Sequence, residues 1–179
     1  MMGGEGPGGP AAVTVQVVCR RCASNAADPL VSPRPRSGVE ARSVIVTYEV
    51  QIIGCVRSTL AALALAPRQG DEGAPRATLE LQAAVHDGLR GIAPGDELVV
   101  LTWLHQARRD VLILHPRNEP GRPLTGVFAT RSPDRPNPIG LHRVRVLAVR
   151  AGALDVEPLE AIDGTPIVDI KPVLARADD

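Results

Sequence analysis

The sequence predicts an all-β (mainly β) fold, an antiparallel barrel or a sandwich, on three observations. From residue 44 onward, short runs rich in β-branched and aliphatic residues alternate with turns that contain Gly or Pro. Helical periodicity is confined to residues 85–91, where one turn of helix is expected before Gly91 and the Pro94-Gly95 pair end it. A succession of strands without intervening helices favours an antiparallel sheet over an α/β fold.

Seven strands are expected in chain order, each bounded by turn residues. They lie at residues 44–56, 78–82, 97–104, 111–114, 124–130, 141–150 and 153–158. Residues 163–172 then begin as a turn and continue as a short strand that ends in a charged residue and a proline. The sequence contains no internal repeat, so one barrel or sandwich accounts for all of these strands.

The chain is expected to divide into an N-terminal extension and one folded domain. Residues 1–10 are mostly glycine and residues 28–38 have few apolar side chains, so residues 1–43 are expected to be disordered. Residues 44–176 form the expected domain, and a chain of 179 residues with 44% hydrophobic content can bury one core. The apolar run at 11–19 lacks a preceding basic region, and no run is long enough to span a bilayer, so a cytoplasmic location is expected.

The composition limits how this chain could bind RNA. Tyr48, Trp103 and Phe128 are its only aromatic residues, 2% of the chain, so the core must be aliphatic and bases find few stacking platforms. The formal net charge is zero, so any RNA contact must come from a local basic patch. A protein that coats RNA nonspecifically is therefore disfavoured.

The cysteines and histidines do not predict a metal site. Cys19 and Cys22 have the spacing of half a zinc knuckle, but a structural zinc needs four ligands and no second pair follows. The four histidines show no metal-ligand spacing either. Cys55 follows a glycine in an apolar run and is expected to be a buried thiol, and no disulfide framework is indicated.

The stretch at residues 126–141 combines two arginines with three prolines. Each proline fixes its own φ and holds the preceding residue in an extended conformation, so the loop is stiff. Arg131 and Arg135 therefore present planar, charged side chains that suit a carboxylate, a phosphate or the face of a base. The alternative is a Pro-rich connection whose arginines point into water.

Lys171, near the end of residues 163–172, is the only lysine in a chain that otherwise uses arginine for every positive charge. This bias indicates that an ammonium group, rather than a guanidinium, is required at that position. The alternative is a solvated strand end.

These segments together resemble one family, the TsaA-like, TrmO-type methyltransferases. The resemblance covers residues 48–174 and is carried by residues 52–58, 67–73, 95–105, 126–141 and 163–172. It implies a small single-sheeted antiparallel β-barrel that binds S-adenosylmethionine and works as a homodimer. The implied reaction is N6-methylation of threonylcarbamoyl-adenosine next to the tRNA anticodon.

The resemblance also implies which residues surround the cofactor. The positions that match the family's cofactor segments are Pro67, Arg68, Gln69, Leu104, His105, Arg131, Leu141, Glu157, Pro158, Leu159 and Glu160. Leu104 stands where relatives carry an aromatic residue, so adenine is expected to pack on aliphatic side chains. Without the family, His105 would more simply be a packed histidine that closes an apolar strand.

The implied chemistry needs alignment first and proton removal second. Methyl transfer from a sulfonium is an in-line displacement that benefits from a shaped, dry pocket, and N6 must lose a proton. Asp163, Asp169 and His105 are the candidate bases, with Asp163 first because its turn adjoins the cofactor segment. Lys171 and Arg135 are expected to bind the threonyl carboxylate.

Contacts to the anticodon stem-loop are expected from a basic stripe on the strand at 141–150. Arg143 and Arg145 are two residues apart, so they share one face of a strand, while Val144 and Val146 share the other. Such arginines suit phosphate groups. The alternative is a half-exposed strand with solvated arginines.

Two functions from other classes fit the same residues. One is a noncatalytic RNA-binding module on the same barrel, which should bind RNA without cofactor. The other is a sensor that binds S-adenosylmethionine without transferring its methyl group, which should ignore tRNA.

Overall fold

The computed structural model describes residues 50–174 of the chain. The expected disorder of residues 1–43, the Cys19 and Cys22 pair, and residues 44–49 of the first expected strand lie outside the described residues.

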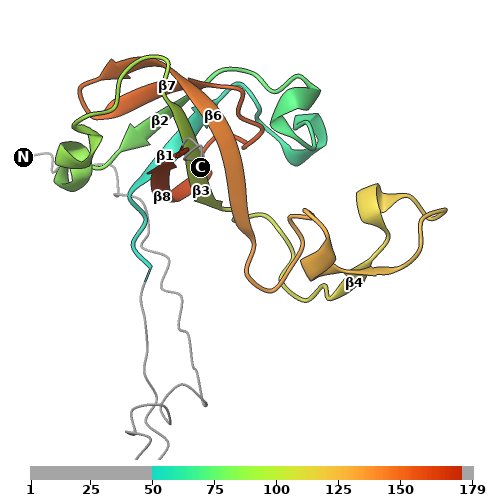
Figure 1. The fold of residues 1–179 in the computed structure, drawn as a ribbon. Helices are drawn as coiled ribbons and strands as arrows, with labels where there is room; N and C mark the ends of the chain where they lie inside the picture. The colour runs from blue at the N-terminus through green and yellow to red at the C-terminus, as the bar shows by residue number, and fades with distance from the viewer. Residues whose placement is uncertain (1–49, 175–179) are drawn as a thin grey trace, which may run out of the picture. The chain divides into compact units, whose positions relative to one another are not determined.

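Six strands close into one antiparallel barrel in the order β1-β2-β7-β6-β3-β8 (Figure 1). Every neighbouring pair is antiparallel, and β8 pairs with β1 to complete the circle. The single-sheeted barrel is therefore confirmed, and the sandwich is excluded. The strands are β1 (Gly54–Ser58), β2 (Ala77–Leu81), β3 (Glu97–Trp103), β6 (Ile139–Arg150), β7 (Ala153–Glu157) and β8 (Pro166–Pro172).

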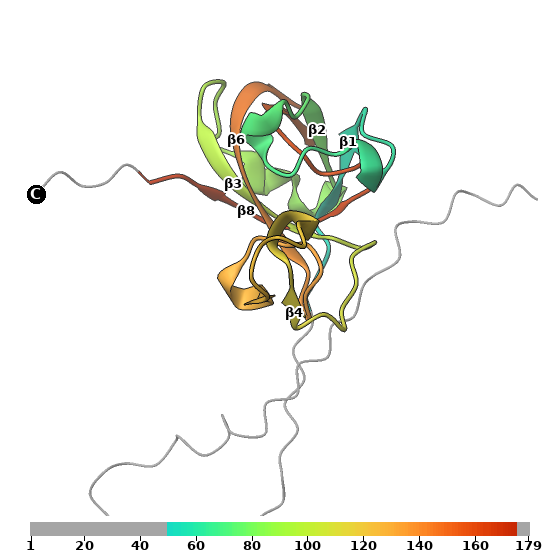
Figure 2. The same ribbon diagram turned by 90° about the vertical axis from the view of Figure 1, so that its right-hand side faces the viewer.

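A lobe outside the barrel, residues 104–138, connects β3 to β6 (Figure 2). It contains a two-stranded sheet and two 3-10 helices, namely β4 (Ile113–Leu114), η5 (Pro116–Asn118), β5 (Thr125–Gly126) and η6 (Val127–Ala129). Three further 3-10 helices join barrel strands: η2 (Leu63–Leu65), η3 (Gly70–Glu72) and η4 (Ala83–Leu89). Within residues 50–174, no helix has the length and apolar character needed to cross a membrane.

Several expected elements differ from the structure. Within the described residues the first strand begins only at Gly54, and the helical turn expected at 85–91 is the 3-10 helix η4. The strands expected at 111–114 and 124–130 shrink to the two-residue β4 and β5. The second one stops because the Val127 carbonyl accepts the Thr130 N–H at 3.1 Å and the Thr130 hydroxyl at 2.9 Å, which closes a 3-10 turn.

The core is aliphatic, as the composition predicted. Alternate residues of each barrel strand point inward, so β6 buries Val144 and Val146 while β3 buries Leu98 and Val100. The same cluster contains six side chains with no exposed surface besides Val100, namely Val56, Leu79, Leu154, Val156, Leu159 and Ile167. Each such side chain stabilises the fold by about 1.5–3 kcal/mol relative to leaving it in water.

Gly54 allows β1 and β2 to approach closely at the start of the barrel. It pairs with Leu81, and a Cβ added to Gly54 would collide with the Glu80 carbonyl oxygen and lie 2.9 Å from Leu81 Cδ2. Because the first obstacle is backbone, it cannot rotate away.

Replacing Gly54 with alanine is expected to destabilise the barrel by about 1–3 kcal/mol, the usual cost of overpacking a close-packed site. Gly88→Ala is the control, because a Cβ there meets nothing within 4 Å. Chemical denaturation of both variants checks this. Equal unfolding free energies would show that β1 shifts to accommodate the methyl group.

Candidate functional site

A chain of polar side chains, Thr102–His142–Glu160, lies inside the barrel beyond the aliphatic core. Thr102 of β3 is fully buried and His142 of β6 is 5% exposed, because both occupy inward positions of their strands. His142 Nε2 lies 2.8 Å from Thr102 Oγ1, and His142 Nδ1 lies 2.8 Å from Glu160 Oε1. The chain connects the barrel interior to the half-buried carboxyl group of Glu160.

The Glu160 carboxylate is held in its ionised form. Burial acts to raise its pKa, but the hydrogen bond and charge of His142, a backbone hydrogen bond and the charge of Arg131 together hold the pKa below its ordinary value. An ionised carboxylate only accepts hydrogen bonds, so His142 Nδ1 is the donor to Oε1. The site therefore presents an anion at neutral pH.

Glycines leave the space that this polar chain occupies. A Cβ on Gly140 would fall on Thr102 Oγ1 and lie 2.5 Å from His142 Nε2 and 3.1 Å from Leu104 Cδ2. On the other side, a Cβ on Gly70 would lie 3.4 Å from Glu160 Oε2. A residue larger than glycine at position 140 would displace the polar chain, whereas a Cβ at position 70 would press on Pro158 Cγ at 3.2 Å and make an ordinary contact with Glu160.

The structure thus brings part of the predicted cofactor set together. Leu104 packs beside Gly140, and Arg131 acts on the Glu160 carboxylate. Pro158 lies against Gly70, whose Cβ would be 3.2 Å from Pro158 Cγ, and Pro67, Arg68 and Gln69 directly precede Gly70. These residues come from five separate segments of the chain.

Other members of the predicted cofactor set point elsewhere. The Leu159 side chain is fully buried in the core, and Glu157 pairs with Arg76 at 2.7 Å. Leu141 is 48% exposed on the outer face of β6, and His105 is exposed, with Nε2 3.4 Å from the Gln106 amide nitrogen. Their side chains do not join the Thr102–His142–Glu160 chain.

Arg135 holds the Pro-rich loop in shape. Its Nε donates to the Ser132 carbonyl at 2.8 Å, and its Nη2 donates to the carbonyls of Val127, at 3.1 Å, and Thr130. Three of the five guanidinium N–H groups are thereby used within the loop, and the two on Nη1 remain for a ligand. Arg131 in the same loop is exposed, and its charge contributes to lowering the pKa of Glu160.

The predicted catalytic residues fall into two groups. Lys171 Nζ lies 2.7 Å from Asp169 Oδ2 on the outer side of β8, opposite Val99 and Leu101 of β3. Asp163 instead accepts the Ser58 N–H at 3.1 Å, a contact that ties the turn before β8 to the end of β1. Asp169 is therefore coupled to Lys171, whereas Asp163 has a structural partner.

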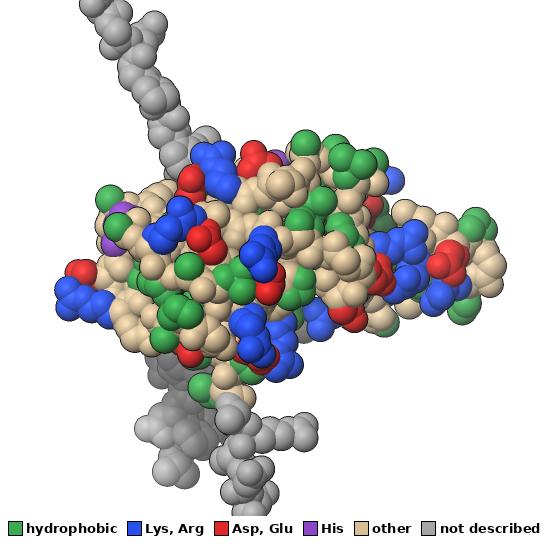
Figure 3. Space-filling view, turned by 90° about the horizontal axis from the view of Figure 1, so that it is seen from above, with side chains coloured by type: hydrophobic (Ala, Val, Ile, Leu, Met, Phe, Trp, Pro, Cys, Tyr) green, Lys and Arg blue, Asp and Glu red, His purple; other side chains and the backbone are tan. Residues whose placement is uncertain are grey.

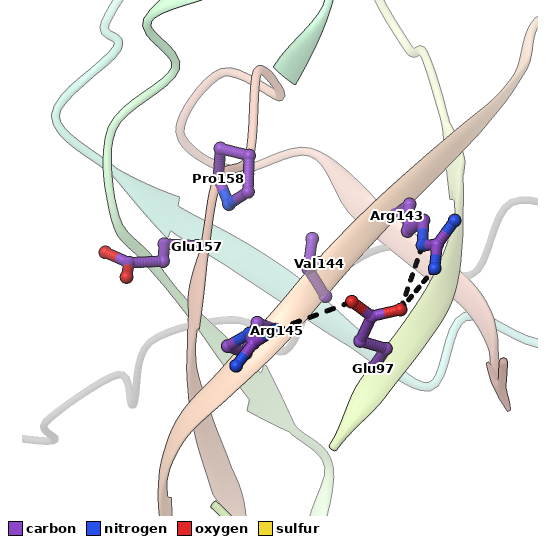
Figure 4. Close-up of a pocket in the computed structure, with 6 residues that line it drawn as sticks. All are labelled: Glu97, Arg143, Val144, Arg145, Glu157 and Pro158. Carbon is purple, nitrogen blue, oxygen red and sulfur yellow. Dashed lines mark hydrogen bonds and ion pairs between the residues drawn. The ribbon is translucent and has the colours of Figure 1, made fainter. Parts of the chain in front are cut away.

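The basic stripe has an acidic partner that the sequence did not reveal. Arg143 and Arg145 do share the exposed face of β6, as predicted, but both pair with Glu97, at 3.1 Å from Arg143 Nε and 3.7 Å from Arg145 Nη2 (Figure 4). The hydrogen bond from Arg143 holds the pKa of Glu97 below its ordinary value. The three side chains line a cavity of about 310 Å³ with Val144, Glu157 and Pro158.

The lobe is linked to the segment before β2 by further ion pairs. Arg117 lies 2.6 Å from Glu72, while Glu119 lies 2.6 Å from Arg122 and 3.8 Å from Arg68. The pairs of Arg117 with Glu72 and of Glu119 with Arg68 join the lobe to residues 68–72, which include Gly70. Figure 3 shows basic and acidic side chains interspersed on one face of the molecule, rather than separated into a basic and an acidic patch.

His142, Thr102 and Gly140 are the residues that sequence reasoning missed. The alternation that placed Val144 on the buried face also places His142 and Gly140 there, and this was the available signal. The partners Thr102 and Glu160 are 40 and 18 residues away from His142 and follow only from the strand pairing.

Comparisons with known proteins identify the domain. Residues 55–179 match a family model described as the tRNA-methyltransferase O N-terminal domain. The chain is 38% identical over 120 residues to "Probable S-adenosyl-L-methionine-binding protein VirR" of Rhizobium radiobacter, covering 67% of each protein. It is 40% identical over 130 residues to a "Probable S-adenosyl-L-methionine-binding protein" of Archaeoglobus fulgidus, covering 73% of this chain and 35% of the relative.

A solved structure agrees with these matches. TrmO from Pseudomonas aeruginosa superposes with a TM-score of 0.58 at 34% identity, over 74% of this chain and 59% of that chain. The chain thus spans little more than half of that structure and about a third of the Archaeoglobus relative. Since the family model extends over most of the sequence, the chain belongs to the family of the tRNA-methyltransferase O N-terminal domain.

Proposed function

We propose that this chain binds S-adenosylmethionine beside Glu160 and methylates N6 of threonylcarbamoyl-adenosine next to the tRNA anticodon. Membership of the tRNA-methyltransferase O N-terminal domain family supports the reaction class, and relatives named for S-adenosylmethionine binding support the cofactor. The structural observation that carries the proposal is the half-buried Glu160 carboxyl group, whose Oε1 lies 2.8 Å from His142 Nδ1 while Oε2 lies 3.4 Å from the position of a Cβ on Gly70.

The residues around Glu160 fit the cofactor's chemical groups. A buried carboxylate accepts hydrogen bonds from hydroxyl or ammonium groups, and a guanidinium pairs with a carboxylate in a bidentate manner. Leu104, beside Gly140, is proposed to supply aliphatic surface for the adenine. When bound, the cofactor supplies a methyl group activated by its sulfonium. Pro67, Arg68, Gln69 and Pro158 are proposed to complete its surroundings.

The outer face of the sheet is proposed to receive the nucleoside. Asp169 orients Lys171, which keeps two N–H groups for the threonyl carboxylate, and Arg135 Nη1 offers a second cationic contact. Leu141 is proposed to line the cofactor pocket from this exposed face. Proton removal from N6 is assigned to Asp163 or His105, both of which are exposed to solvent.

A homodimer is proposed to form through the lobe. Phe128 is 82% exposed, and Leu112, Ile113 and Leu124 are each at least 60% exposed on the same small sheet and its flanks. Large apolar side chains that gather on one element characterise protein interfaces. A second copy of the chain is the proposed partner.

The decisive experiment is methyl transfer to threonylcarbamoylated tRNA in the presence of S-adenosylmethionine, read by mass spectrometry of the nucleosides. A gain of one methyl group on the modified adenosine, absent from tRNA without threonylcarbamoylation, is expected. A chain that binds the cofactor by calorimetry but leaves every nucleoside unchanged would instead be a sensor, a role that the names of the relatives also allow.

Arg131→Ala is expected to weaken S-adenosylmethionine binding by about 1.5–3 kcal/mol, the contribution of a charged hydrogen bond. Arg90→Ala removes an exposed arginine on the η4 side that pairs with Asp87, and it is the matched control. Calorimetry on both variants tests the assignment. Unchanged affinity in Arg131→Ala would move Arg131 out of the cofactor pocket.

The Arg143→Ala and Arg145→Ala double variant is expected to raise the Michaelis constant for tRNA and to lessen its dependence on salt, with cofactor affinity unchanged. The control is Arg57→Ala, because β1 lies opposite β6 in the barrel order and Arg57 pairs with Glu80 in the same manner. Steady-state kinetics at two or more salt concentrations provide the measurement. If both variants change the Michaelis constant equally, the stripe is not the RNA contact.

Phe128→Asp is expected to convert the dimer to a monomer, because a charge placed in an apolar interface loses its hydration. Leu65→Asp, at a site on η2 that is 67% exposed, is the control and should leave the dimer intact. Size-exclusion chromatography with light scattering distinguishes the two states. A wild-type monomer, or a dimer in Phe128→Asp, would rule out this interface.

A further inference from the structure

His142 carries more than a packing role, because all of its polar atoms have partners in a buried setting. The ring is 5% exposed and bridges Thr102 of β3 to Glu160 in the segment between β7 and β8. Burying a polar ring is costly unless both nitrogens are satisfied. An aliphatic residue, as at the neighbouring inward position Val144, would fill the same space without this requirement.

The two hydrogen bonds survive a change in the charge of His142. Nδ1 donates to the Glu160 carboxylate, which can only accept. Nε2 then accepts from the Thr102 hydroxyl when the ring is neutral, or donates to Thr102 Oγ1 when the ring is protonated. Since a hydroxyl can serve in either direction, Glu160 keeps the same orientation in both states.

One oxygen of Glu160 remains directed toward the Gly70 segment. Oε1 is taken by His142, while Oε2 lies 3.4 Å from the position of a Cβ on Gly70, which the glycine leaves empty. Gln69 and Arg68 precede this glycine. Oε2 is therefore the acceptor that faces the region proposed for the cofactor.

We infer that His142 is a positioning residue for cofactor binding, which fixes Glu160 through Nδ1 so that Oε2 accepts a hydrogen bond from a donor group of the cofactor. The inference rests on the proposed function for the nature of the ligand. It adds a residue that touches neither cofactor nor substrate and that acts only through Glu160.

The same geometry predicts a pH profile. Within residues 50–174, two side chains lower the pKa of Glu160: the ring of His142 and, on the Pro-rich loop, Arg131. Thr102 on β3, the other partner of His142, is uncharged. Because the pKa of Glu160 lies below its ordinary value, its contribution to binding is present at neutral pH and is lost only as the pH falls through that lowered value. Without His142, burial would dominate and the loss would begin at higher pH.

Two substitutions separate positioning from packing. The amide nitrogen of asparagine is as many bonds from Cα as His142 Nδ1, and that of glutamine is as many bonds away as Nε2. His142→Asn therefore keeps a donor toward Glu160, whereas His142→Gln keeps a partner only for Thr102. Both variants keep a polar side chain in the cavity, so each serves as the other's control for folding, which thermal melting checks.

The experiment is calorimetric titration of the full chain with S-adenosylmethionine across the pH range from 4 to 8 (about the span of the ordinary Glu and His pKa values). His142→Gln is expected to weaken binding about tenfold or more and to lose affinity at a higher pH than wild type. His142→Asn should stay within about threefold of wild type. At neutral pH Glu160→Gln should weaken binding about as much as His142→Gln, but without the pH-dependent loss because an amide does not titrate, and combining them should add little further loss because both remove one interaction.

The outcomes distinguish a positioning role of His142 from a structural one, and both from a failure of the proposed function. If His142→Gln binds with wild-type affinity and pH profile, or if Asn and Gln lose affinity equally, His142 has only a structural role and the inference is wrong. If wild type itself binds no S-adenosylmethionine, the proposed function fails instead. A matching titration with methylthioadenosine, which lacks the ammonium and carboxylate groups, identifies the donor group of the cofactor. If His142→Gln also binds methylthioadenosine more weakly than wild type, the donor lies on the nucleoside. If the two bind it equally, the donor lies on the amino-acid end.

Discussion

The inward and outward alternation of residues 98–102 on β3 and 139–146 on β6 is the constraint on which the rest of the structure depends. Because all of β3 pairs with residues 139–145 of β6, Val100 stands opposite His142 and Thr102 stands opposite Gly140. A closed barrel of six strands leaves little interior volume, so aliphatic residues fill it until Thr102 and His142 introduce polar atoms. Buried polar groups need hydrogen-bond partners, and Glu160 is the acceptor for His142 Nδ1.

The same pairing distributes the outward residues. Val99 lies between Arg143 on one neighbouring strand and Lys171 on the other, and Leu101 lies between Leu141 and Asp169. The outer face thus carries two cations level with Val99 and, level with Leu101, an apolar neighbour on one side and the Asp169 carboxylate on the other.

The sequence predicted the barrel strands and the faces of β6 because the period of two is a local property of the chain. It also predicted a stiff loop around Arg131 and Arg135, since prolines act on their immediate neighbours. It did not predict that Arg135 would turn back onto the carbonyls of its own loop, nor that Glu97 would pair with Arg143 and Arg145. Such contacts depend on the tertiary structure, and the alternation of apolar and polar residues along a strand contains no information about them. The lengths of β4 and β5 were overestimated because the apolar residues in these parts of the lobe lie on its exposed surface and do not pair in a sheet.

The lobe's ion pairs have a consequence for local unfolding. Within residues 104–138, Val127 is the one hydrophobic side chain of the buried core set, so the lobe has little apolar burial of its own. Its links to residues 68–72 are exposed pairs such as Arg117 with Glu72, which stabilise weakly and are screened by salt. Segments of this kind open at a lower free energy than the barrel that carries them. The lobe and the turn around Gly70 would then exchange amide hydrogens as one unit, and rising ionic strength would release both together while the barrel remained closed.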